Sequence, residues 1–306
     1  MSTTESPMTT TAENSIRSPR GRSAWRLILV VATTLSGWQL YVASGRTPAG
    51  PAAGTEFGVP WNPWETRVNY RPPGLPIRVG TFNIHGAVGL DRHRDLGRIA
   101  GCLQGMFFVG LNEVHGTDPW GALDQAELLG RQLNMAWLFA PTERRWWHDH
   151  FGNGALSDNQ VRSWQQIPLD TAGSKSGRNA LLVSIDHFDA QPLRALVTHL
   201  DRSDPQRSAQ LRTVIDLFLA LAPPAILLGD LNSTVDDPLI QRLLAAPGAV
   251  DALAGTSAGK GRIDWIVSRG LKCTKSGMIP AGPSDHPCFW AEFFFTNGEW
   301  GIGNGE

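Results

Sequence analysis

The chain has 306 residues, of which 42% are hydrophobic and 18% are charged, and its formal net charge is −1. This length allows a globular domain with a sizeable core, and the three cysteines fit neither a disulfide framework nor a CxxC metal site. Because proteins that grip duplex phosphates usually have a basic surface, the near-neutral charge argues against a non-specific duplex-binding protein.

The N-terminal region is predicted to lie outside the folded domain. Residues 1–24 are rich in Ser, Thr and Pro and are expected to form a disordered cytoplasmic tail. Four arginines in this region lead into 17 uncharged residues at 27–43, so we expect a transmembrane signal anchor over residues 25–43 with everything after it exported. A signal peptide cleaved near 42–44 would export the same domain, and the sequence leaves this alternative open.

Two further segments are expected to lack a fold of their own. Residues 44–76 are rich in Pro and Gly and show little periodicity, so we expect an extended linker there. The glycine-rich residues 297–306 are expected to be a disordered tail. The folded domain is therefore predicted to span residues 77–296.

Within the domain, strand-like and helix-like segments alternate. The strand candidates are 77–84, 107–114, 180–186, 194–200, 224–231, 262–268 and 288–295. A helix is expected over 94–103, and Asp-Pro pairs at Asp118, Asp204 and Asp237 are each expected to open another. Strands interleaved with helices predict an α/β domain.

Polar residues of a restricted kind stand at the ends of these strands. They are Asn83, Glu113, His199, Asp230, Asn232, Asp264, Asp285 and His286. Acids, amides and imidazoles in such positions suggest that the side chains meet at one edge of a sheet, where ligand sites of α/β proteins often lie.

Seven motifs in this order resemble the endonuclease/exonuclease/phosphatase family, whose best-known members are DNase I-like nucleases. The motifs are TFNIHG (81–86), LNEV (111–114), GNGALS (152–157), THLD (198–201), GDLN (229–232), RIDWIV (262–267) and SDHPC (284–288). The resemblance implies a DNase I-like four-layer α/β sandwich, in which helices flank two packed mixed β-sheets. It also implies a metal-dependent hydrolase of phosphate esters.

For the metal, the resemblance points to Glu113 as the first ligand. Asn83 would support it, either as an amide oxygen ligand or as a partner of the ligand, and Asp285 would complete the site. A cluster with no Cys and mostly carboxylates favours Mg²⁺ or Mn²⁺ over Zn²⁺.

For the chemistry, His286 is the candidate general base, because imidazole has a suitable pKa. Asp264 resembles the family's carboxylate that fixes the tautomer of this base. The alternative for Asp264 is a salt bridge to the neighbouring Arg262.

Three more residues complete the expected site. Asp230 would orient the attacking water, and Asn232 would donate to a phosphate oxygen. His199 would contact the phosphate or protonate the leaving oxygen. The alternative for His199 is a core histidine that caps a strand.

The sequence departs from the family at a phosphate-binding Tyr, since the only tyrosines are Tyr41 and Tyr70. His150 and Asn153 are candidates to replace it. The stretch ERRWWHDH (143–150) is expected to be a basic, aromatic loop that rests on lipid or stacks on a base, or that plugs the core with one Trp.

The sequence therefore predicts a membrane-anchored, metal-dependent phosphoesterase that hydrolyses a phosphodiester, either a lipid headgroup or a small phosphoester. The alternatives are an exported Mg-dependent nuclease and a non-catalytic binding module on the same fold. No protein partner can be inferred. A Glu113 carboxylate more than about 12 Å from the His286 imidazole would exclude a shared phosphate and overturn this hypothesis.

Overall fold

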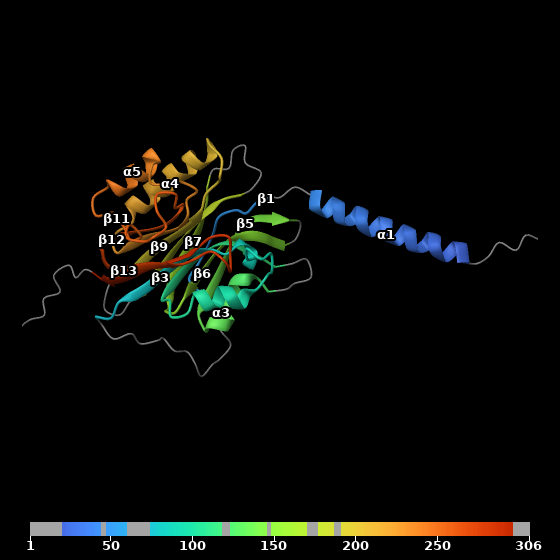
Figure 1. Ribbon diagram of the computed structural model, residues 1–306, viewed down its shortest axis with the longest axis horizontal. Helices are drawn as coiled ribbons and strands as arrows, with labels where there is room; N and C mark the ends of the chain where they lie inside the picture. The colour runs from blue at the N-terminus through green and yellow to red at the C-terminus, as the bar shows by residue number, and fades with distance from the viewer. Residues whose placement is uncertain are drawn as a thin grey trace, which may run out of the picture. The chain divides into compact units, whose positions relative to one another are not determined.

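The computed structural model describes residues 20–43, 47–59, 74–117, 123–145, 148–169, 177–186 and 191–295. The chain divides into two compact units, Met1–Gly45 and Arg46–Glu306. The second unit contains both β-sheets and every candidate site residue (Figure 1). The predicted tail at 297–306 lies outside the described residues, as does most of the predicted tail at 1–24.

The first sheet, here called sheet A, has seven strands in the order β1-β5-β6-β4-β3-β14-β13. Its strands are β1 (Thr47–Pro48), β3 (Ile77–Asn83), β4 (Phe108–His115), β5 (Ala136–Arg145), β6 (His148–Ser157), β13 (Leu271–Ile279) and β14 (Cys288–Phe295). The neighbours β3 and β4 run parallel, whereas the other pairs are antiparallel, so the sheet is mixed.

The second sheet, sheet B, also has seven strands, in the order β11-β12-β10-β9-β8-β7-β2. Its strands are β2 (Ala52–Gly54), β7 (Val161–Pro168), β8 (Asn179–Ile185), β9 (Leu193–His199), β10 (Ala225–Asp230), β11 (Val250–Asp251) and β12 (Asp264–Arg269). Here β9 and β10 form the parallel pair.

Helices cover the outer faces of both sheets. α2 (Leu96–Cys102) and α3 (Gln125–Leu133) share a buried cluster with β3 and β4, and η1 (His85–Ala87) follows β3. α4 (Gln206–Ala220) and α5 (Pro238–Leu244) pack on sheet B, and a third cluster fills the space between the sheets. Figure 1 shows α4 and α5 on one side of the strands and α3 on the other. The predicted four-layer α/β sandwich is confirmed.

The seven expected strands all form, because each carries a run or alternation of buried apolar residues. β10, with the sequence AILLGD, is buried at every position. Asp237 caps α5 as expected, by accepting the Leu239 N–H. A helix was also expected to begin at Asp118, a residue that lies outside the described residues. The helix that the structure describes in this region is α3, and its N-cap is Asp124.

Strands β5, β6, β7, β11 and β13 were not expected, and two of them, β5 and β6, correct a prediction. The stretch 143–150 was expected to be a loop, but its described residues belong to the hairpin of β5 and β6. Its two tryptophans, at 146 and 147, lie outside the described residues. Glu143 and Arg145 are buried, so this stretch is part of the sheet rather than a solvated loop.

Part of the segment expected to be a linker packs on the domain instead. Residues 47–58, here called the edge strap, add β1 to the edge of sheet A and β2 to the edge of sheet B. Phe57 is buried in the core between the sheets, and Gly58 lies against the Trp137 ring. Paired sheet edges and a buried Phe account for the order of a segment whose Pro and Gly content predicted a spacer.

The expectation of a membrane anchor at 25–43 is not supported. The segment is helical, within α1 (Arg20–Ala43). Within the part of the chain that the structure describes, however, no helix is both long and apolar enough to cross a membrane.

The strand directions explain where the polar residues gather. The parallel pairs β3–β4 and β9–β10 end at the same edge of the sandwich, and the antiparallel strands β12 and β14 begin there. Asp230 at the end of β10 pairs with Asp264 at the start of β12. This edge, here called the rim, therefore collects residues from both sheets.

Candidate active site

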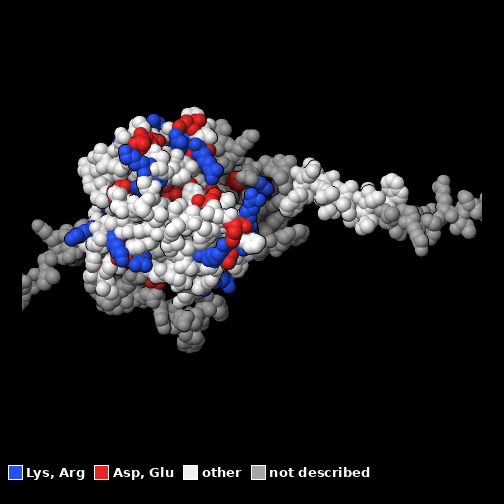
Figure 2. Space-filling model, viewed as in Figure 1, with Lys and Arg blue, Asp and Glu red and all other residues white. Residues whose placement is uncertain are grey.

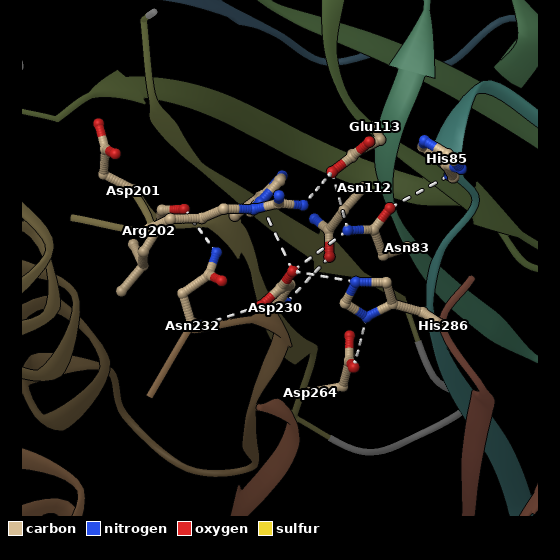
Figure 3. A network of polar contacts seen from close by, with 12 residues as sticks. Asn83, His85, Asn112, Glu113, Asp201, Arg202, Asp230, Asn232, Asp264 and His286 are labelled. Atoms are coloured by element: carbon tan, nitrogen blue, oxygen red, sulfur yellow. Dashed lines mark hydrogen bonds and ion pairs between the residues drawn. The ribbon is translucent and has the colours of Figure 1, made fainter. Parts of the chain in front are cut away.

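His286 and Asp264 form a hydrogen-bonded pair at the rim. His286 Nδ1 lies 2.8 Å from Asp264 Oδ2, and Asp264 is buried (Figure 3). Arg262 contacts Asp264 only through the backbone, because Nη1 donates to the Asp264 carbonyl while Nη2 pairs with Asp251. The Asp264 carboxylate is therefore left to His286, as the tautomer-fixing role requires.

Asp230 lies at the centre of the site. Its Oδ2 accepts a hydrogen bond of 3.1 Å from Asn83 Nδ2 and lies 3.5 Å from His199 Nε2 and 3.8 Å from His286 Nε2. Its Oδ1 accepts the backbone N–H of Asn232 at 2.9 Å. One carboxylate thus contacts four of the predicted site residues.

The backbone around Asp230 is shaped for close approach between strands. Gly229 has φ of 135°, and a Cβ atom there would lie 1.8 Å from the Thr198 carbonyl oxygen of β9. Only glycine fits at this position. Asn232 has φ of 48°, a left-handed conformation that Asn tolerates better than most residues.

Burial and charge shift the three central pKa values in different directions. Burial, followed by the charge of Asp264, raises the pKa of Asp230 to about 7. Burial lowers the pKa of His286, but the hydrogen bond and charge of Asp264, with Asp230 and Asp285, outweigh it and raise this pKa to about 9. Burial, followed by the positive charge of Arg178, lowers the pKa of His199 well below 6.5.

The predicted metal ligand Glu113 is joined to this cluster through Asn83. Glu113 Oε1 accepts a hydrogen bond of 3.2 Å from Asn83 Nδ2, and Glu113 has the unusual φ of 55°. The contacts from Glu113 through Asn83 and Asp230 place Glu113 Oε1 no more than about 10 Å from His286 Nε2. This meets the distance condition set by the sequence.

The amide of Asn83 is oriented as a partner of the ligand. Its nitrogen faces the carboxylates of Glu113 and Asp230, and its oxygen accepts the His85 backbone N–H. This orientation fits the supporting role among the two that the sequence allowed.

Asp285 lies beside His85. Its carboxylate is 3.6 Å from His85 Nδ1 and is partly exposed. The group whose ligand atoms lie within 4.8 Å of one another, in the described part of the chain, is instead Asp230, Asp264 and His286.

A chain of buried asparagines supports the site from below, and sequence reasoning missed it. Asn112 accepts the Asp230 backbone N–H at 3.0 Å and donates to Asn153 at 2.8 Å. Asn153 in turn donates to Asn179 at 2.8 Å. The only sequence signal was a repeated Asn inside apolar strands, in LNEV, GNGALS and RNALLV.

The asparagine chain shows whether Asn153, one of the two candidates to replace the missing Tyr, is available for phosphate. Asn153 is buried, and its amide oxygen and nitrogen are both hydrogen-bonded within the asparagine chain. It therefore supports the fold and does not replace the Tyr. His150 lies with its ring 6.1 Å from that of His115, at the end of β4.

Two arginines also missed by sequence reasoning approach the carboxylates. Arg202 Nη2 lies 3.9 Å from Glu113 Oε1, and its side chain is 67% exposed (Figure 3). Arg178 precedes β8, and its guanidinium interacts with the charges of Asp201, Glu113 and Asp230. The rim thus has cations beside its acids, and Figure 2 shows the same mixture of both signs on one face of the domain.

The geometry agrees with the comparison of the sequence with known families. The family model described as the Endonuclease/Exonuclease/phosphatase family matches residues 80–286, which is more than half of the chain. No curated protein sequence matches the chain.

Solved structures share the fold. The endonuclease/exonuclease/phosphatase from Beutenbergia cavernae has a TM-score of 0.59 at 22% identity, with 72% of each chain covered. The human Nocturnin catalytic domain with bound sulfate has a TM-score of 0.57 at 18% identity, covering 74% of this chain and 96% of that one. Truncated TDP2 from Caenorhabditis elegans has a TM-score of 0.55 at 21% identity, covering 72% and 98% respectively.

Proposed function

Because the chain belongs to the endonuclease/exonuclease/phosphatase family, we propose that it is a divalent-metal-dependent phosphodiesterase with its catalytic residues at the rim. Members of this family are typically hydrolases of phosphoester bonds. The observation that supports catalysis best is the row Asp264–His286–Asp230, in which one imidazole has a carboxylate at each ring nitrogen.

The residues present fit a hard divalent cation. Glu113 and Asp230 offer carboxylate oxygens that share one amide donor, Asn83, and positive charge between them would be strongly favoured. We expect Mg²⁺ or Mn²⁺ to be held by Glu113, with Asp230 and Asp285 as further candidates. Such a cation would neutralise the phosphoryl oxygens and offset the negative charge that keeps His286 protonated.

In the proposed reaction, neutral His286 takes a proton from water at Nε2 while the water oxygen bonds to phosphorus. The bond from phosphorus to the leaving oxygen breaks, and this oxygen keeps the electron pair and takes a proton from solvent. Asp264 holds the other ring nitrogen and stabilises the imidazolium that forms. Asp230, 3.8 Å from Nε2, lies where it can accept the second proton of the water as a hydrogen bond.

His199 and Asn232 would contact the phosphoryl group. The lowered pKa of His199 keeps its ring neutral near neutral pH, so it is suited to donate a hydrogen bond rather than to act as an acid. Asn232 donates one amide hydrogen to the Leu200 carbonyl, which leaves the second for a phosphate oxygen.

We propose a lipid headgroup or a small phosphodiester as the substrate class, because the net charge of −1 does not favour a non-specific duplex binder. A nuclease is the competing function, and salt separates the two. Turnover of a nucleic acid should fall steeply as salt rises, whereas turnover of a small diester should change little. A panel of DNA, RNA, phosphoinositides and sphingomyelin on residues 46–306 would identify the class.

Export of the domain is also a proposal. It is supported by the arginines that precede the uncharged residues 27–43, which predict that later residues leave the cytoplasm. Fractionation of a C-terminally tagged chain tests it: recovery of the domain with cytoplasmic markers would contradict export, and a shortened soluble product would indicate cleavage.

Catalysis is tested by the Mg²⁺-dependent release of p-nitrophenol from bis(p-nitrophenyl) phosphate. Glu113→Gln and His286→Gln should each lower kcat by about 100-fold or more. Arg242→Gln, which removes only a surface ion pair with Asp216, is the matched control and should retain wild-type turnover. Equal turnover in all four proteins would favour the non-catalytic module.

A further inference from the structure

The site as described has few donors for a phosphoryl group. Hydrolysis requires the anionic oxygens of the substrate to be held by positive or hydrogen-bonding groups. The Tyr used for this in the family is absent, Asn153 is bound within the fold, and His199 is neutral. A fixed cation close to the carboxylates would supply what is missing.

Arg178 lies at the rim, and contacts on both sides fix the position of its backbone. β8 pairs with β9 so that Ala180 lies opposite Thr198, which puts Arg178 beside the end of β9 at the rim. The Arg178 carbonyl accepts the Leu169 N–H, and the Asn179 carbonyl accepts the Thr198 hydroxyl. A Cβ on Gly177 would lie 2.0 Å from the Thr142 oxygen, so the backbone at 177 packs directly against β5.

The guanidinium of Arg178 lies within electrostatic range of the acids of the site. The residue is half-buried, and its Nε is buried with no hydrogen-bond partner in the described part of the chain. It interacts electrostatically with four acids, and its positive charge reaches His199; the acids are Asp201, Glu113, Asp230 and the buried Glu143. Burial lowers the pKa of Arg178 and these acids raise it, but an arginine remains protonated in either case.

We propose that Arg178 binds a non-bridging phosphoryl oxygen of the substrate and replaces the absent Tyr as the phosphate contact. The inference rests on the proposed function, because it names the group that recognises the phosphate at the same site. A half-buried, pre-positioned guanidinium makes charge-assisted hydrogen bonds to phosphate and loses little conformational entropy in doing so.

The alternative is that Arg178 only balances the charge of the acidic cluster. The two roles predict different effects on two ligands. If Arg178 grips phosphate, its loss should weaken phosphate binding and leave Mg²⁺ binding unchanged or tighter, because a repelling cation has gone. If it only balances charge, its loss should tighten Mg²⁺ binding and leave phosphate affinity as it was.

The test uses residues 46–306, with Mg²⁺ alone and then inorganic phosphate on the Mg²⁺-loaded protein, both by calorimetry. Arg178→Gln should weaken phosphate binding by about 10- to 100-fold, and Arg178→Lys by less, because Lys keeps the charge without the planar fork. Arg162→Gln is the matched control. Arg162 lies near the start of β7, at the end of that strand far from Arg178, and it is 62% exposed and pairs with Asp186.

Arg178→Ala adds a measurement within one variant, with and without added guanidinium, so any effect of the substitution on folding is the same in both arms. Added guanidinium chloride at low concentration should restore part of the phosphate affinity in this variant and not in Arg162→Gln. Phosphate binding by Arg178→Gln within about twofold of wild type, or no phosphate binding by the wild type, would overturn the proposal. Because phosphate binding needs no turnover, an inactive protein that still binds phosphate through Arg178 would refute the proposed function alone.

Discussion

Two histidines at the rim, His199 and His286, differ in charge because their neighbours differ. His286 has carboxylates near both ring nitrogens, and the attraction exceeds the effect of burial, so its pKa rises to about 9. His199 is more deeply buried and lies near a cation, so its pKa falls. The same side chain is thereby suited to take a proton in one position and to donate a hydrogen bond in the other.

The first prediction concerns the carboxylate behind the base. Asp264→Asn should lower kcat by about 100- to 10,000-fold, because the amide neither fixes the tautomer of His286 nor stabilises the imidazolium. KM and Mg²⁺ affinity should change by less than about threefold, since Asp264 is turned towards the ring. Steady-state kinetics and calorimetry check this, and a kcat within about threefold of wild type would remove Asp264 from the catalytic residues.

The second prediction is a loss of stability at alkaline pH in the metal-free protein. The pKa of His286 is raised from 6.5 to about 9 on folding, so its stabilising contribution is full below about pH 6.5 and is lost as the pH rises through about 9. The difference corresponds to about 3 kcal/mol of unfolding free energy.

Urea denaturation in EDTA at about pH 7 and about pH 10 measures this loss. His286→Gln lacks the titrating group and should lose less stability over the same interval than the wild type does. An equal loss in both proteins would show that other groups cause the pH dependence.

At the scale of single residues, the sequence predicted the acids, amides and imidazoles that stand at strand ends. His286, Asp264, Asp230, Asn83 and Glu113 do come together. The asparagine chain and Arg178 could not be predicted, because an Asn or Arg within or before a strand does not show which residues it will contact. The role of such a residue depends on which strands become neighbours in the fold.

At the scale of elements, the edge strap shows how a segment of low periodicity acquires order. β1 pairs with β5, and β2 pairs with β7, so the strap closes one edge of each sheet. Trp164 Nε1 donates to the Glu56 carbonyl, and Gln166 donates to the Gly50 carbonyl. A chain that lacks the strap would expose two unpaired strand edges, which are sites of aggregation.

The third prediction follows from the burial of Phe57 in this strap. Phe57→Ala should lower the free energy of unfolding by about 3 kcal/mol, because it leaves a cavity in the core between the sheets. Val59→Ala changes an exposed side chain directly after the strap and should change stability by less than about 0.5 kcal/mol. Equal midpoints in urea for the two variants would show that the strap is not part of the cooperative fold.

Elements were predictable where their pattern was local. β10 and β14 are apolar runs and were found, with bounds that differ from the structure by at most one residue. β13 was missed because Lys272, Thr274 and Lys275 interrupt its apolar pattern at the edge of sheet A. The strap was missed because its strands consist of two and three residues and depend on partners far along the chain.

At the scale of the whole molecule, the site requires the two sheets to be held in one register. The rim takes Asn83 and Glu113 from sheet A and His199, Asp230 and Asp264 from sheet B. An apolar interface between sheets is not directional, so it does not by itself fix their relative position. Hydrogen bonds are directional, and the asparagine chain runs from β10 through Asn112 and Asn153 to β8.

The last prediction separates this positioning role from stability. Asn153→Ala leaves Asn112 and Asn179 without their shared partner, which should cost about 2–4 kcal/mol of unfolding free energy. Asn159→Ala is the matched control: Asn159 is also buried and hydrogen-bonded, to the Asp186 carbonyl, but has no bond to the asparagine chain.

Both variants should therefore lose stability, whereas only Asn153→Ala should lower kcat, by about 10-fold or more, because a displaced Asn112 no longer fixes the backbone of Asp230. Denaturation curves and turnover of bis(p-nitrophenyl) phosphate, both measured well below the unfolding midpoint, separate the two effects. If the two variants lose turnover equally, the asparagine chain stabilises the sandwich without positioning Asp230, and the alignment of the sheets must then be attributed to the packing of the core alone.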